Sequence, residues 1–163
     1  EVDDITGIKI CSFTEAITLP YSAPTNTENA QYNIGFPIAC YLVFGQVGPR
    51  QALNEYKNEK VLSLMSKMKV EHDPELQAIF PTTTKTRLEI TMQDGTVYKS
   101  NAMQPEGDYN YKPFDDAAIK EKYTRFVTPV LGKEKTEAFY EKVMNLEKLE
   151  KAGELFDGLN LIN

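Results

Sequence analysis

The most apolar stretch of this sequence runs from Ile34 to Phe44, and none of its side chains is charged or strongly polar. It is far shorter than the roughly 20 residues that cross a bilayer, so it predicts a buried core segment. Pro37 limits its conformation, because a proline ring and its missing N–H are tolerated only in the first turn of a helix. The sequence therefore predicts a helix that starts near Asn33 or Ile34, with Asn33 as the candidate N-cap, and that Gly45 closes as the C-cap.

A β-hairpin is predicted later in the chain. Apolar and polar residues alternate from Arg87 to Met92, and the turn Gln93-Asp94-Gly95 follows. A two-residue Asp-Gly loop would set Ile90 opposite Lys99 and mix the core face with the solvent face. A three-residue loop with its glycine in the left-handed conformation sets Ile90 opposite Tyr98 instead, and we prefer this register.

Periodicity and turn formers place the remaining elements. We expect a strand over 5–13, a loop over 19–26, helices over 49–56 and 58–68, and irregular structure over 73–84. A further helix is capped by Asp115 and ended by Pro129 and Gly132. A helix over 133–149 and a short last helix follow it. In the helix after Asp115, the predicted inward face includes Ile119 and Val130. The predicted fold is a single α+β domain over residues 1–163, with a small antiparallel sheet, several helices and one central buried helix.

Composition excludes some partners. The chain has 163 residues, a net charge of −6 and a pI near 4.9, and its lysines are spread among acidic residues. Nucleic acid and anionic membranes are therefore not expected partners. Cys11 and Cys40 are predicted to be free, reduced thiols, which favours a cytoplasmic protein. The start at Glu1 has no secretory signal and no initiator Met, and it reads like a piece of something longer.

The sequence contains no complete catalytic or metal-binding set. His72 is the single histidine, so neither a zinc site nor a Ser/His/Asp arrangement can be built around it, and a surface role is expected. The acidic clusters at Asp3-Asp4, Asp94 and Asp115-Asp116 are predicted to be a strand entry, a turn and a helix cap. The loop Gly107–Tyr111 is either a plain surface loop or a contact for a ligand or a subunit.

Three parts of the chain together resemble the C-terminal domain of the MmgE/PrpD family. They are Asn33–Gly45, the pair Lys69–Glu75 and Thr86–Gly95, and Lys112–Tyr123. The family includes 2-methylcitrate dehydratase, cis-aconitate decarboxylase and iminodisuccinate epimerase. The similarity covers nearly the whole chain, from about residue 2 to residue 158.

The resemblance implies a two-domain enzyme in which this domain is a lid over an active site built by an N-terminal helical domain. It implies a lyase or isomerase that acts on a small polycarboxylate without a metal or an organic cofactor, in a homodimer of the full-length protein. The family's acid–base residues lie mostly in the helical domain. No catalytic residue is therefore expected in this chain, which would be inactive by itself.

The resemblance also indicates which residues of this chain would face the substrate. The pocket candidates are Tyr32, Asn33, Gly35, Phe36, Asp108 and Tyr109. Two positions depart from the family pattern, because Phe36 replaces a common Tyr and Asp108-Tyr109 replaces a common His-Pro. Phe cannot donate a hydrogen bond, so Tyr32, Tyr109 or Tyr111 would have to supply the missing hydroxyl. The alternatives are a non-catalytic binding or assembly module with the same fold, and an unrelated α+β domain.

Overall fold

A computed structural model describes residues 1–159, and their packing separates into two compact units. Unit 1 covers Glu1–Tyr111, and unit 2 begins at Lys112. Unit 1 contains a four-stranded sheet with helices, and unit 2 is helical, which confirms the predicted α+β class. The prediction that residues 1–163 form one domain stays a prediction. Every helix in the described range is too short or too polar to span a membrane.

The sheet is mixed. Its strands are β1 (Ile5–Ser12), β2 (Met68–His72), β3 (Arg87–Met92) and β4 (Val97–Lys99), in the order β2-β1-β3-β4. β1 pairs with β3 and β3 with β4 in antiparallel fashion, but β1 and β2 are parallel. The predicted antiparallel sheet is therefore wrong for one pair of strands. Parallel neighbours need a long crossover, and the segment between β1 and β2 supplies it with several helices.

The hairpin has the register that the sequence predicts. Ile90 lies opposite Tyr98, and Gly95 has a φ of 84°. The backbone N–H of Met92 donates to the carbonyl of Thr96 at 2.8 Å and closes the loop. A positive φ costs glycine less than any other residue, so this residue favours the loop type and thereby the register.

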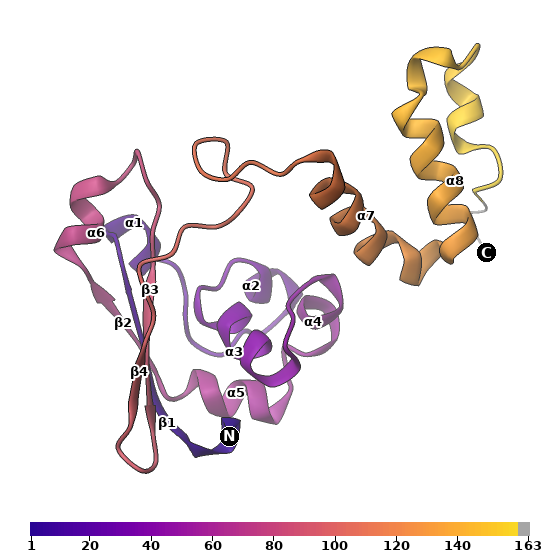
Figure 1. Cartoon of the computed structure of the whole chain (residues 1–163). Helices are drawn as coiled ribbons and strands as arrows, with labels where there is room; N and C mark the ends of the chain where they lie inside the picture. The colour runs from indigo at the N-terminus through magenta and orange to yellow at the C-terminus, as the bar shows by residue number, and fades with distance from the viewer. Residues whose placement is uncertain (160–163) are drawn as a thin grey trace. The chain divides into compact units, whose positions relative to one another are not determined.

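The helices of unit 1 group on one side of the sheet, apart from the short helices α1 (Thr14–Ile17) and α6 (Pro74–Ile79) near the end of β1 (Figure 1). The bounds of the others are α2 (Thr27–Gln31), α3 (Gly35–Phe44), α4 (Pro49–Asn54) and α5 (Glu59–Met65). α3 is the central apolar helix, and it packs mainly against α5. Helix α2 lies in a segment for which the sequence predicted no separate element.

Helix α3 ends as its sequence predicts. Gly45 has a φ of 68°, and its N–H donates to the carbonyl of Tyr41 at 2.8 Å. Pro37 is the third residue of the helix and therefore lies in the first turn, where it breaks no hydrogen bond. A proline in the first turn and a glycine cap thus agree with the two observed ends of the most apolar element.

The hydrophobic core lies between the sheet and helices α2, α3 and α5. Its fully buried members include Ile10, Phe36 and Cys40. Met68 also belongs to this core, but as the first residue of β2, not as part of the predicted helix over 58–68. Val61, Leu64 and Met65 have helical spacing, and Met68 happens to fit the same spacing because the inward residue at the start of β2 is also apolar.

The segment over 73–84, which the sequence predicted to be irregular, contains helix α6. Asp73 is its N-cap, accepting hydrogen bonds from the N–H groups of Glu75 and Leu76, and Pro74 is the first helical residue. An Asp-Pro start is a standard helix signal. The prediction gave more weight to the prolines and threonines that follow, and it was wrong for these six residues.

The described part of unit 2 is built around two helices, α7 (Asp116–Leu131) and α8 (Lys133–Met144), followed by two short 3-10 turns. Asp115 caps α7 as predicted, accepting from the N–H of Ala118 at 2.8 Å. The prediction that Pro129 helps to end this helix is wrong, because Pro129 lies inside α7, which runs to Leu131. Gly132 is its C-cap as predicted, with a φ of 75°.

The predicted inward face of α7 is exposed at its two ends and half-buried in between, at Tyr123, Phe126 and Val127. Ile119 is 49% exposed and Val130 is 78% exposed. The hydroxyl of Tyr123 donates to the carbonyl of Thr136 at 2.9 Å and joins α7 to α8. The two helices therefore contact each other through the middle of α7, and the periodicity overestimates how much of the helix is covered.

Candidate functional site

The first turn of α3 is held by one buried side chain, Asn33, which is 5% exposed. Its Oδ1 accepts from the N–H of Gly35 at 2.9 Å and from the N–H of Phe36 at 2.8 Å. Its Nδ2 donates to the carbonyl of Ser22 at 2.9 Å. Asn33 thus makes the hydrogen bonds expected of a cap, although Ile34 is the residue directly before the helix, so the cap lies one residue earlier than the helix boundary. The same amide also fastens the preceding loop to the helix. Both ends of the amide are occupied by backbone groups, so Asn33 orients this turn.

Gly35 lies where the backbone approaches two neighbours closely. A Cβ atom at this position would be 2.8 Å from Sδ of Met68 and 3.2 Å from the carbonyl oxygen of Tyr21. Cβ atoms in proteins do not approach other heavy atoms to 2.8 Å, so any side chain here would push Met68 away. The packing of α3 against the start of β2 explains this glycine.

Phe36 is 1% exposed and belongs to the core, and it also borders an apolar groove between α2, the start of α3 and α4. The groove has a volume of about 570 Å³ and no charged lining residue. Val47 and Leu53 are 41% and 55% exposed. The lining residues are Ala30, Gln31, Phe36, Pro37, Val47, Gly48, Pro49, Ala52 and Leu53.

The lining of this groove determines what chemistry it can support. Apolar side chains exclude water and contact apolar surface, but they neither transfer protons nor pair with carboxylates. Gln31 is the one polar side chain among the lining residues. The sequence indicated Phe36 as a pocket residue but did not indicate Val47 or Leu53. In the sequence, Val47 looks like an ordinary loop residue and Leu53 like part of an ordinary amphipathic helix.

The other candidate residues lie in exposed positions. Tyr32 follows α2 directly and is 70% exposed, so its hydroxyl is open to solvent. Tyr109 is 85% exposed, whereas Asp108 is half-buried. Oδ1 of Asp108 accepts from the N–H of Asn110 at 2.9 Å, and its carbonyl accepts from Tyr111 at 3.0 Å. These bonds hold Asp108 within its own loop. The structure thus groups Tyr32, Asn33, Gly35 and Phe36 around one turn and places Asp108 and Tyr109 on a separate loop.

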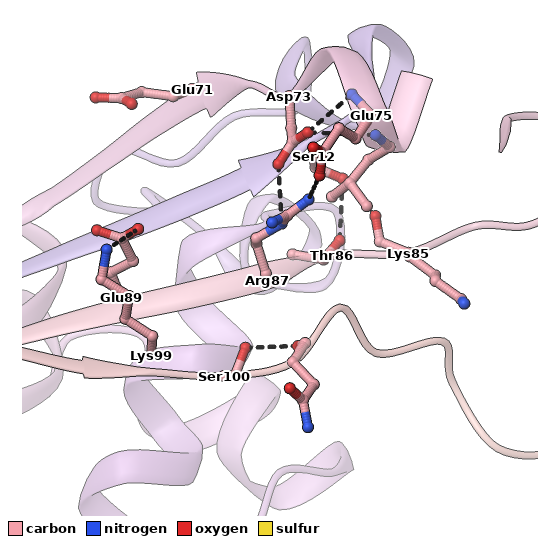
Figure 2. Close-up of polar contacts among 12 residues, drawn as sticks. Ser12, Glu71, Asp73, Glu75, Lys85, Thr86, Arg87, Glu89, Lys99 and Ser100 are labelled. Atoms are coloured by element: carbon pink, nitrogen blue, oxygen red, sulfur yellow. Dashed lines mark hydrogen bonds and ion pairs between the residues drawn. The ribbon is translucent and has the colours of Figure 1, made fainter. Parts of the chain in front are cut away.

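A polar cluster that the sequence did not predict lies at one end of the sheet (Figure 2). Nε of Arg87 is 2.9 Å from Oδ2 of Asp73, and its terminal nitrogen donates to Glu75 at 2.7 Å. Nearby, the hydroxyl of the buried Ser12 lies 3.0 Å from the hydroxyl of the half-buried Thr86. β1 lies between β2 and β3, so this cluster joins two segments that do not pair as strands. The Arg87 guanidinium pairs with two carboxylates, and the two hydroxyls are hydrogen-bonded to each other, which is typical of a structural contact.

A row of charges crosses the open side of the sheet. The carboxylate of Glu89 is 3.1 Å from the amines of both Lys9 and Lys99. The hydrogen bonds from Lys9 and then from Lys99 hold the pKa of Glu89 below its ordinary value. The opposite charges on neighbouring strands favour the observed register, as cross-strand pairs do in general.

The remaining reactive side chains are inert or exposed. Burial raises the pKa of the Cys40 thiol to about 11 and also raises that of Cys11, so both stay protonated at neutral pH. Both are free thiols. His72 is exposed at the end of β2, in agreement with the predicted surface role. Among residues 1–159, no cluster of three His, Cys, Asp or Glu side chains could hold a metal ion.

Comparison with known proteins gives a family. The family model described as the MmgE/PrpD C-terminal domain matches residues 1–148. A comparison with curated proteins finds no match. The matched range includes all four strands and the whole of the turn at Asn33. Because the match covers most of the chain, this protein belongs to the MmgE/PrpD family, as a C-terminal domain of that family.

Proposed function

We propose that this chain is the lid domain of an MmgE/PrpD-type lyase or isomerase acting on a small polycarboxylate, as 2-methylcitrate dehydratase does. In this proposal the lid closes an active site that an N-terminal helical domain builds, and it supplies pocket walls instead of acid–base groups. The observation that carries the proposal is the uncharged groove beside the first turn of α3, in a domain of this family. Such a surface can exclude water from a reaction that other residues perform.

The roles of the candidate residues follow from their exposure. Tyr32 is the group best placed to contact a substrate, because its hydroxyl is open to solvent beside the ordered turn. Asn33 and Gly35 act as positioning residues, and Phe36 forms part of the wall. In this proposal Asp108 and Tyr109 contribute a contact from a separate loop, in which Asp108 accepts hydrogen bonds from the N–H groups of Asn110 and Tyr111.

The proposal also names partners and conditions. The partners are the helical domain, the polycarboxylate substrate and a second subunit in a homodimer of the full-length protein. The chemistry needs no metal or organic cofactor, and the location is cytoplasmic. Catalysis belongs to the full-length protein, so the isolated domain is expected to be inactive.

The test compares the full-length protein with this chain alone. We expect the full-length protein to turn over 2-methylcitrate or cis-aconitate and the isolated chain to show no turnover, measured by substrate loss. Turnover by the isolated chain at the full-length rate would overturn the lid role. In the full-length protein, Tyr32→Phe should lower kcat/KM, whereas Tyr41→Phe, a matched exposed tyrosine on α3, should leave it unchanged.

The second candidate function is a non-catalytic binding or assembly module that keeps the fold. The observation that favours it is Phe36, whose ring is buried and offers no hydroxyl where the family commonly has Tyr. This alternative predicts that the full-length protein has no dehydratase or decarboxylase activity and that Phe36→Tyr creates none. Activity that appears or rises in the Phe36→Tyr variant would contradict it.

A further inference from the structure

We draw no further inference here: the strongest candidate, the exposed apolar side of α7 around Ile119 and Val130, carries nothing because nothing in the structure shows what covers it.

Discussion

At the scale of single residues, the turn before α3 depends on two side-chain choices that look minor in the sequence. Asn33 uses its whole amide to hold three backbone groups, and Gly35 leaves room for Met68 and for a backbone carbonyl. A buried amide with all these bonds made costs little, but losing one leaves a backbone group unpaired. The position of Phe36, and with it the edge of the groove, therefore depends on Asn33 and Gly35.

The contact of Gly35 with Met68 gives a residue-scale prediction. Gly35→Ala should destabilise unit 1 by about 1–3 kcal/mol, because the added Cβ would lie 2.8 Å from Sδ of Met68. Met68→Ala alone should also destabilise, by about 2–5 kcal/mol, since it leaves a cavity in the core. Urea unfolding of the two single variants and the double variant measures their coupling.

We expect the double variant to lose less stability than the sum of the single losses, by at least about 0.5 kcal/mol. Gly7→Ala is the control, because the nearest atom to its added Cβ would lie at 3.8 Å, an ordinary contact distance. Strict additivity of Gly35→Ala and Met68→Ala would show that their close contact does not limit the packing of α3.

At the scale of elements, helix ends and strand pairs carry the order of unit 1. α3 is apolar on all sides, so its sequence alone gives little information about its orientation, and its two caps fix where it begins and ends. In the sheet, the glycine of the hairpin turn and the row of charges through Glu89 favour the same register. Consistent local and cross-strand signals of this kind explain why the hairpin was predicted correctly.

The C-cap of α3 gives one prediction at this scale. Gly45→Val should destabilise unit 1 by about 1 kcal/mol or more, because a β-branched residue is strained at a φ of 68°. No neighbour would lie within 4 Å of the added Cβ, so the loss would come from the backbone conformation. Gly45→Asn is the matched control, since Asn tolerates this conformation. Equal melting temperatures for the Val and Asn variants would contradict the assignment.

The charged row gives a pH-dependent prediction. The pKa of Glu89 is lowered in the folded state, so its ion pairs stabilise the fold above the pKa of the unfolded state and are lost as the pH falls. Glu89→Gln should therefore be less stable than the wild type at neutral pH, and the difference should shrink on acidification. Urea unfolding of both proteins at neutral pH and at acidic pH measures this difference in stability. Glu71→Gln should have a smaller effect at neutral pH, because its contact with Lys9 is longer, 3.8 Å. A gap for Glu89→Gln that widens in acid would be inconsistent with the lowered pKa.

At the scale of the whole molecule, the structure describes two compact units joined near Tyr111. Unit 1 contains the sheet, its core and the candidate turn, whereas α7 has no buried residue within its own unit. The two units therefore differ in how much of their apolar surface they bury themselves. Unit 1 has the more extensive core and should resist unfolding and proteolysis better.

Limited proteolysis tests this difference. We expect chymotrypsin to cut first at Tyr109, which is 85% exposed in a loop, and to leave unit 1 as a protected fragment. Mass spectrometry of the early products identifies the bond, and Tyr109→Ser should slow this first cut. Tyr98 is also exposed, at 62%, but it is paired in β4, so Tyr98→Ser should not change the first cut. An initial cut inside the hairpin would show that the sheet is less stable than the loop.

The sequence by itself determined the central helix, its glycine C-cap, the hairpin register and the cap of α7. These features follow from sterics and hydrogen bonds within a few residues, such as a proline in the first turn or a glycine with positive φ. For the candidate turn, it also singled out Asn33, whose amide makes the capping hydrogen bonds. Only the tertiary structure decided that β2 lies parallel to β1 and that Asp73 meets Arg87. It also decided that Leu53 and Phe36 line one groove. Those contacts depend on which distant segments become neighbours, and no local pattern in the chain specifies that choice.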